Sequence, residues 1–287
     1  MRVAFIGLGV MGFPMAGHLQ QAGFDVCVYN RNADKAAAWV AQYGGDSAAT
    51  PAAAAVGAAL IMMCVGNDDD VRAVTYGDTG VLAGAQAGAV LVDHTTVSAD
   101  LARELEIASG DQGVGFLDAP VSGGQAGAEN GQLTIMVGGE EPTFDVAMPV
   151  LACYARCVRL LGPAGSGQLA KMVNQVCIAG VVQGLAEGLH LAETAGLDAA
   201  AVVEVISQGA AQSWQMENRY QTMLAGEYEH GFAVDWMRKD LAIVLQEASR
   251  LGIELELTRL VDGFYKEVQA MGSGRWDTSS LLARLKD

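Results

Sequence analysis

The sequence predicts an α/β domain with a doubly wound, mainly parallel sheet, followed by an all-helical domain. The first half of the chain alternates short apolar or β-branched runs with alanine-rich helical stretches, the pattern of strand–helix–strand units. A turn-rich segment, Gly162–Gly167, separates this half from a stretch in which only helical patterns occur. With 287 residues, of which 51 % are hydrophobic and 17 % charged, the chain is long and apolar enough for two domains.

The elements of the first half follow from short apolar runs punctuated by glycine and polar residues. Strands are predicted at Val3–Ile6, Asp25–Tyr29, Leu60–Val65, Val90–Asp93, Gly115–Asp118 and Leu133–Val137. Helices are predicted between them at Val10–Ala22, Ala33–Tyr43, Pro51–Ala55, Val71–Tyr76 and Ala99–Ser109. This order requires right-handed crossovers and a parallel sheet.

The second half is predicted to be helical throughout, with a domain boundary near Leu161. We therefore expect one domain over residues 1–161 and a second over residues 162–287. The predicted helices are Gln168–Ala195, Asp198–Ser207, Ser213–Leu224, Val234–Leu251 and Leu257–Met271. The first would be roughly 40 Å long at 1.5 Å per residue, and it is expected to join the two domains.

Charge and composition exclude several classes of partner. The formal net charge is −16, which repels nucleic acid and anionic membrane surfaces. The five cysteines lack CxxC or disulfide-like spacing, and the four histidines lack metal-ligand spacing, so neither a disulfide framework nor a metal site is expected. The run Asp68–Asp70 is interpreted as a helix-capping, solvated loop rather than a cation site. These features predict a soluble cytoplasmic protein.

A glycine motif at the N-terminus predicts a Rossmann-type dinucleotide site. It follows the first predicted strand directly and opens the first predicted helix, in the spacing GxGxxG. The first glycine makes a tight turn, the second lets a pyrophosphate approach the backbone, and the third permits close packing of helix on strand. The expected cofactor-binding residues are Gly7, Leu8, Gly9, Val10, Met11 and Gly12.

The end of the second strand favours NADP over NAD. An NAD-specific enzyme usually carries an acidic residue there for the ribose hydroxyl, whereas this chain has Asn30, Arg31 and Asn32, with Lys35 one turn later. Without that carboxylate, Arg31 can pair with a 2′-phosphate through its planar guanidinium. The alternative is that Arg31 stacks on adenine or lies in solvent.

Three segments give the chain a family resemblance. They are Gly7–Ala16, the run Asp118-Ala119-Pro120-Val121-Ser122-Gly123-Gly124, and the run Gly165-Ser166-Gly167-Gln168-Leu169-Ala170-Lys171-Met172-Val173-Asn174-Gln175. In this order they resemble the signatures of β-hydroxyacid dehydrogenases, which include 3-hydroxyisobutyrate dehydrogenase and tartronate semialdehyde reductase. Lys239-Asp240-Leu241 resembles the family's C-terminal cofactor-contacting motif, and the resemblance covers essentially the whole chain.

Lys171 is the predicted proton-transfer residue. It is the only lysine between Lys35 and Lys239, and it lies in the most apolar predicted helix, where a lysine without a role would be costly. A buried lysine with a lowered pKa can protonate a developing alkoxide or deprotonate an alcohol. The alternative is a lysine whose amine reaches the surface.

The resemblance implies further roles for residues near Lys171. Asn174 and Gln175 share its helix face. The family resemblance assigns Asn174 to orienting the lysine and the substrate hydroxyl, and it places Gln175 close to the substrate as a substrate-binding residue. The Asn-Gln pair resembles the tartronate semialdehyde reductase branch. The alternative for Gln175 is a surface amide.

Other family positions are expected to contact substrate or cofactor. Ser122, Gly123 and Gly124 form a cradle for a substrate carboxylate, with a plain turn as the alternative. The expected nicotinamide and cofactor contacts are Val65, Thr96 and Lys239. His94 is expected to pack or to face solvent. Trp214, Phe232 and Asp235 either wall the pocket or are structural.

The sequence therefore predicts an NAD(P)-dependent oxidoreductase that reduces a short carboxylate-bearing semialdehyde or oxidises the matching 3-hydroxyacid. The alternatives are a decarboxylating 6-phosphogluconate dehydrogenase, an imine reductase, which usually lacks the lysine, and a non-catalytic nucleotide sensor. The excess of apolar helices after Leu161 predicts oligomerisation, and the family resemblance implies a homodimer or homotetramer. The substrate itself, the direction of the reaction and the number of subunits stay open.

Overall fold

The computed structural model describes residues 1–286, in which nine strands form one mainly parallel sheet. The strand order is β3-β2-β1-β4-β5-β6-β8-β7, and β9 pairs with β8. The pairs β6–β8 and β7–β8 are antiparallel, whereas the other pairs are parallel. The strands are β1 (Arg2–Ile6), β2 (Asp25–Tyr29), β3 (Asp46–Ser47), β4 (Leu60–Met63), β5 (Val90–Asp93), β6 (Gly115–Asp118), β7 (Val121–Ser122), β8 (Leu133–Gly139) and β9 (Ala155–Leu160).

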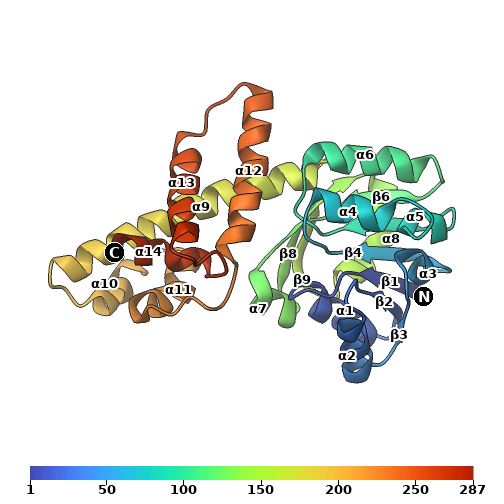
Figure 1. The fold of residues 1–287 in the computed structure, drawn as a ribbon, viewed down its shortest axis with the longest axis horizontal. Helices are drawn as coiled ribbons and strands as arrows, with labels where there is room; N and C mark the ends of the chain where they lie inside the picture. The colour runs from blue at the N-terminus through green and yellow to red at the C-terminus, as the bar shows by residue number, and fades with distance from the viewer. Residues whose placement is uncertain (287) are drawn as a thin grey trace. The chain divides into compact units, whose positions relative to one another are not determined.

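Helices cover both faces of this sheet (Figure 1). Buried residues of α1, α2 and α8 pack on one face, and buried residues of α3, α4, α5 and α6 pack on the other. Side chains that alternate along β1 serve the two faces in turn: Val3 and Phe5 join the first cluster, and Ala4 and Ile6 join the second. The helices are α1 (Gly12–Gln21), α2 (Ala33–Tyr43), α3 (Pro51–Ala55), α4 (Asp68–Thr75), α5 (Val81–Gly84), α6 (Ala99–Gly110), α7 (Gly124–Glu129) and α8 (Glu141–Leu151).

The strand order changes direction at β1, which is the position where such sheets bind ligands. β1 pairs with β2 on one side and with β4 on the other, both in parallel register. The helices that follow β1 and β4 therefore leave toward opposite faces and open a crevice at the carboxyl ends of these strands. The glycine motif follows β1 at this point.

The chain divides into a unit of residues 1–171 and a unit from residue 172 onward. Helix α9 (Ser166–Thr194) begins in the first unit and continues into the second, whose buried core consists of helical residues. The remaining helices are α10 (Ala199–Ile206), α11 (Trp214–Ala225), α12 (Val234–Leu251), α13 (Glu256–Ala270), the 3₁₀ turn η1 (Thr278–Ser280) and α14 (Leu281–Lys286).

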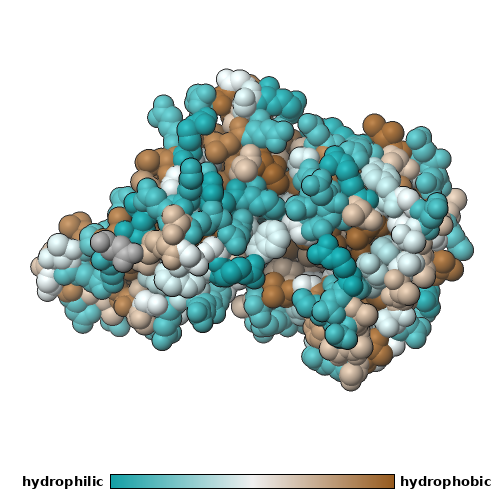
Figure 2. Space-filling model, in the orientation of Figure 1, coloured by the Kyte–Doolittle hydropathy of each residue, from teal (hydrophilic) through white to brown (hydrophobic). Residues whose placement is uncertain are grey.

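Helix α9 is the one described helix that is long and apolar enough to cross a membrane. Within its most apolar window 44 % of the residues are buried inside the structure. Core helices of soluble proteins meet the same criterion, and α9 supplies buried residues such as Ala179, Val182 and Ala186 to the second core. Figure 2 shows a face on which hydrophilic residues predominate and hydrophobic ones are scattered.

The structure confirms the predicted fold class and adds elements that the patterns did not reveal. Helix α8 has Pro142 in its first turn and Pro149 in its interior, and these prolines concealed its helical pattern. Strand β9 is largely exposed, and strand β7 has only two residues, so neither produces a long apolar run. The predicted strand Leu60–Val65 ends earlier, at Met63.

Candidate active site

The glycine loop after β1 has the three local properties that the motif predicts. Gly7 has φ +98°, and its N–H donates to the Tyr29 carbonyl at 2.8 Å. A Cβ at Gly7 would collide with the Cys64 carbonyl, and one at Gly12 would collide with the Gly7 carbonyl. A Cβ at Gly9 would meet no atom within 4 Å. The open space at Gly9 and the N-terminus of α1 fit a bound pyrophosphate.

The polar residues after β2 brace this loop. The Leu8 N–H donates to Asn30 Oδ1 at 2.9 Å, and Asn30 Nδ2 donates to the Asn32 carbonyl at 2.9 Å. Asn32 is the N-cap of α2, where its Oδ1 accepts the Asp34 N–H at 2.9 Å. Asn30 and Asn32 thus have structural roles in addition to the cofactor contacts predicted for them.

The cations after β2 are at the surface. The Arg31 side chain is 88 % exposed, and its Nη1 lies 3.3 Å from Asp70 Oδ1. Lys35 is exposed in the first turn of α2. The interpretation of Asp68–Asp70 as a capping, solvated loop is corrected by the structure, because these residues form the first turn of α4 and Asn67 is its N-cap. Within residues 1–286 no group of three His, Cys, Asp or Glu side chains could hold a metal ion.

The segment after β5 is fixed by hydrogen bonds on both sides of Thr96. The Thr95 N–H donates to Asp93 Oδ1 at 2.9 Å, and Thr95 Oγ1 accepts the Val65 N–H at 3.0 Å. Thr96 itself is half-buried. Val65 and Thr96, both predicted to contact the cofactor, therefore lie on segments that Thr95 holds together.

The loop after β7 needs glycine at two successive positions. Ser122 ends β7, Gly123 has φ +134°, and Gly124, the first residue of α7, has φ +62°. Residues other than glycine rarely adopt these backbone angles. A Cβ at Gly124 would meet no atom within 4 Å, so backbone is accessible there. Consecutive N–H groups of this kind form anion-binding concavities, as the predicted carboxylate cradle requires.

Lys171 lies in the second turn of α9 and is buried, with 7 % of its surface exposed. Its helix starts against the sheet of the first unit. Asp118 at the end of β6 accepts the Gly165 N–H at 2.7 Å and the Gln168 N–H at 2.8 Å. The Gln168 side chain is buried and bonded to the backbone of Thr95 and Val97. Lys171 is therefore a buried residue on a fixed helix end, and its burial favours the proton-transfer prediction over a lysine whose amine reaches the surface.

In the second unit a hydrogen-bonded chain joins α9 to α12. Asn174 Nδ2 donates to Gln175 Oε1 at 2.8 Å, and Gln175 Nε2 donates to Asp240 Oδ2 at 2.7 Å. Lys239 Nζ lies 3.1 Å from Asp240 Oδ1. Gln175 is 1 % exposed, so it is not the surface amide of the alternative interpretation. Asn174, Gln175 and Lys239 are thus connected through one buried carboxylate.

Three further residues named from the sequence have structural contacts. Trp214 begins α11 with the Arg219 guanidinium 5.0 Å from its ring centroid. Phe232 packs partly buried against the second core, and its N–H donates to Asp277 Oδ2 at 2.8 Å. Asp235 is half-buried and bonds to Gln269. These contacts support the structural alternative for the three residues.

Burial shifts the pKa of two neighbours at the end of β5 in opposite directions. Desolvation raises the pKa of Asp93 to about 7 and lowers that of His94 to about 4. His94 Nδ1 lies 2.6 Å from the Ala119 carbonyl and Nε2 lies 2.9 Å from the Tyr154 hydroxyl, contacts that suit a neutral ring. His94 is therefore a packing residue, which was one of the two possibilities given from the sequence; the other was exposure to solvent.

Sequence reasoning did not identify the roles of Asp118, Gln168 and Asp240. All three stand inside the quoted family segments, but their positions there do not reveal which backbone groups they bond. A signal was present in each case, because all three are polar residues in apolar or helix-starting contexts, where burial requires a partner.

Comparison with known proteins identifies both halves of the chain. Residues 2–162 match the family model described as the NAD binding domain of 6-phosphogluconate dehydrogenase. Residues 165–285 match the model described as NAD-binding of NADP-dependent 3-hydroxyisobutyrate dehydrogenase. With the glycine loop at the sheet's switch point, these matches define an NAD(P)-dependent oxidoreductase.

Full-length relatives narrow this class to a family. An uncharacterized oxidoreductase of Shewanella frigidimarina is 65 % identical over 99 % of this chain and 98 % of its own length. The 2-hydroxy-3-oxopropionate reductase of Escherichia coli is 31 % identical over 100 % of this chain and 97 % of its own. A structure of Mycobacterium tuberculosis 3-hydroxyisobutyrate dehydrogenase with L-serine matches with a TM-score of 0.88 and 30 % identity, covering 100 % of this chain and 99 % of that one. The chain belongs to the 3-hydroxyisobutyrate dehydrogenase family, as its sequence signatures predicted.

Proposed function

We propose that this protein catalyses reversible hydride transfer between NADP(H) and a short semialdehyde or 3-hydroxyacid that carries a carboxylate, with Lys171 as the general acid and base. The observation that carries the proposal is a buried lysine on the anchored start of α9, followed after one turn by Asn174 and Gln175. Burying an amine is costly, so its position on this helix favours a chemical role.

Each group of residues has a separate role in the reaction. When bound, the nicotinamide supplies or accepts the hydride. The N–H groups and hydroxyl of Ser122–Gly124 hold the substrate carboxylate. Lys171 donates a proton to the carbonyl oxygen as negative charge develops there, and in the oxidative direction it takes that proton back. Asn174, one turn along the helix, orients the lysine and the substrate hydroxyl.

The substrate class follows from the cradle and the Asn-Gln pair. A loop of accessible N–H groups selects an anion, and no atom lies within 4 Å of the position that a Cβ would take at Gly124. The Escherichia coli relative is named a 2-hydroxy-3-oxopropionate reductase, which supports a three-carbon semialdehyde acid as the first candidate. The preference for NADP is supported by Arg31 and by the absence of an acidic residue at the end of β2.

The test is turnover of NADPH or NADH, followed by absorbance, with tartronate, methylmalonate and succinic semialdehydes. Lys171→Ala is expected to lower kcat by roughly 10²- to 10⁴-fold, with little change in cofactor affinity. Lys266→Ala, which removes an exposed lysine of α13, is the matched control and should behave like wild type. A folded protein that binds cofactor but turns over no semialdehyde would instead support the nucleotide-sensor alternative.

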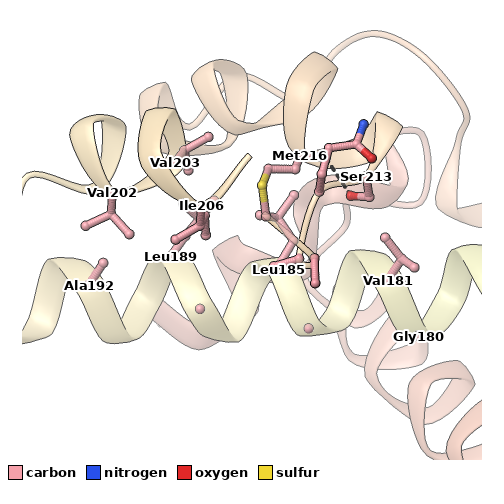
Figure 3. Close-up of a pocket in the computed structure, with 15 residues that line it drawn as sticks. Gly180, Val181, Leu185, Leu189, Ala192, Val202, Val203, Ile206, Ser213 and Met216 are labelled. Carbon is pink, nitrogen blue, oxygen red and sulfur yellow. Dashed lines mark hydrogen bonds between the residues drawn. The ribbon is translucent and has the colours of Figure 1, made fainter. Parts of the chain in front are cut away.

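We also propose that the protein acts in the cytoplasm as a homodimer or homotetramer. An apolar groove of about 420 Å³ lies between α9, α10 and α11 in the second unit. Figure 3 shows Val202 and Ile206 of α10 pointing toward α9 across it. Val181 and Ile206 are 41 % and 39 % exposed there, which favours an apolar partner surface.

Sedimentation velocity tests the oligomer. Ile206→Asp is expected to shift the protein toward monomer, because it places a charge in the groove. Val146→Asp introduces the same charge on exposed α8 and serves as the control. A wild-type monomer at micromolar concentration would refute the proposal.

A further inference from the structure

Gln168 connects the start of α9 to the segment that carries Thr96. Its side chain is completely buried. Nε2 donates to the Thr95 carbonyl at 2.8 Å, and Oε1 accepts the Val97 N–H at 3.1 Å. One amide therefore satisfies backbone groups on both sides of Thr96, and it uses a donor and an acceptor together.

Asp118 fixes the same helix end from the end of the neighbouring strand, β6. Its two carboxylate oxygens accept the N–H groups of Gly165 and Gln168, so the first turn of α9 has partners for donors that a helix cannot satisfy internally. The positive end of the helix dipole also favours this buried carboxylate.

The helix end has no room to move toward the sheet. A Cβ at Gly167 would lie 2.5 Å from the Met136 carbonyl and 2.7 Å from the Asp118 carbonyl. A Cβ at Gly138 would lie 2.8 Å from the Gly167 nitrogen. Glycine at both positions lets the helix backbone contact the sheet directly, and this contact sets the height and rotation of the first turn.

We infer that Gln168, supported by Asp118, is a positioning residue that sets the location of the Lys171 amine relative to Thr96. Lys171 follows Gln168 by three residues, so the two side chains project from the same helix face about 4.5 Å apart along the axis. The inference rests on the proposed function and deepens it. The proposed function requires the Lys171 amine to transfer a proton, and the inference adds that Gln168 places the amine where it can do so.

An amide suits this position better than the alternatives of similar size. A glutamate would retain an acceptor for the Val97 N–H but would place a second oxygen against the Thr95 carbonyl. A methionine would fill the space and leave both backbone groups without their partner, at a cost for each buried group. A misplacement of about 1 Å can lower a rate about 100-fold without any change in the reacting groups.

The kinetic test compares Gln168→Met with Gln183→Met. Gln183 is also buried on α9, where its Nε2 donates to Glu187 at 2.6 Å, so the control removes a buried amide from the same helix. We expect Gln168→Met to lower kcat about 100-fold and to change the Kd for NADPH less than threefold, whereas the control stays within twofold of wild type in kcat. Equal losses of kcat in the two variants would overturn the inference.

A second readout does not depend on turnover. The chain has five lysines, so protein labelled with ¹³C at the lysine Cε gives few signals, and Lys171→Arg assigns the one of interest. We expect the pKa of Lys171 to change by at least about 0.5 pH unit in Gln168→Met and to stay constant in Gln183→Met. An unchanged titration in both variants contradicts positioning.

The two readouts separate the inference from the proposed function. If wild type turns over no semialdehyde but the Lys171 titration moves only in Gln168→Met, the function fails and the positioning stands. If wild type is active and neither kcat nor the titration responds to Gln168→Met, the positioning fails alone. Should Gln168→Met not fold, as judged by circular dichroism, the neutral variant Gln168→Leu replaces it in both measurements with the same expected changes.

Discussion

Two glycine loops in the first unit, for which we propose anionic ligands, are built differently. The loop Gly7–Gly12 follows β1 and opens the ten-residue helix α1, whereas the loop Ser122–Gly124 follows β7 and opens the six-residue helix α7. In the first loop the accessible residue, Gly9, does not have a positive φ. In the second, the accessible residue, Gly124, has φ +62°.

This difference separates two reasons for glycine. Gly9 is needed for the space that it leaves, because nothing in the folded chain occupies the position of its Cβ. Position 124 requires glycine for its backbone angle as well as for space, because a residue with a Cβ is strained at that φ. A substitution at Gly9 should therefore affect the ligand only, whereas one at Gly124 should affect both ligand and folded chain.

The largest expected effect is on cofactor binding in Gly9→Ala. The added methyl group occupies the approach of the pyrophosphate and breaks at least one charge-assisted backbone hydrogen bond, worth about 1.5–3 kcal/mol. The Kd for NADPH, measured by fluorescence titration, should rise roughly 10- to 100-fold. The thermal midpoint of the ligand-free protein should match wild type, and a large drop in that midpoint would contradict the comparison.

Gly124→Ala should give a smaller effect on a different ligand. Its Cβ meets no atom but requires a left-handed backbone, which costs about 1–2 kcal/mol of stability. If the backbone relaxes, its N–H turns away, and KM for the carboxylate substrate should rise about tenfold, the equivalent of one weak charge-assisted hydrogen bond. Cofactor Kd is the internal control. A shift in cofactor Kd as large as that in KM would show that the two loops are not separate sites.

The sequence predicted the first loop more completely than the second. The motif Gly7–Gly12 specifies strand, turn and helix together, so the roles of its three glycines could be derived from local geometry. The cradle depended on the family resemblance, because Ser122-Gly123-Gly124 without it is also an ordinary turn. Asp118, Gln168 and Asp240 could not be assigned, since their partners lie 47, 73 and 65 residues away in sequence and depend on tertiary packing.

The two loops should also differ in their response to acid. The neutral amide of Asn30 braces the first loop, whereas strand β7 and the second loop follow Ala119, whose carbonyl is hydrogen-bonded to His94. The pKa of His94 is about 4 in the folded chain and 6.5 in the unfolded chain, so the unfolded chain binds a proton at higher pH than the folded chain does. The free energy of unfolding therefore falls as pH decreases from 6.5 to about 4. Asp93, with its pKa raised to about 7, acts oppositely, because its contribution falls as pH rises from 3.8 to about 7.

Asp93→Asn should remove the opposing contribution of Asp93 and leave the contribution of His94 to the pH dependence of stability. Between pH 5 and 6 the free energy of unfolding of the variant, relative to wild type, should rise with pH by at most about 1.4 kcal/mol per pH unit. Urea unfolding at pH 5, 6 and 7 measures this difference. Parallel pH profiles for the two proteins would mean that Asp93 ionises equally in the folded and unfolded chains.

The smallest expected effect concerns the outer edge of the first loop. Arg31 is exposed and pairs with Asp70, so its contribution to a 2′-phosphate is that of a surface ion pair. Arg31→Ala should weaken NADP binding by up to roughly fivefold and leave NAD binding unchanged. Asp70→Asn is the informative counterpart, because it frees the guanidinium from its competing carboxylate while the amide retains the size of the side chain. That variant should bind NADP more tightly than wild type. Equal changes for NADP and NAD in either variant would remove Arg31 from the phosphate site and leave cofactor choice to the backbone around Asn30.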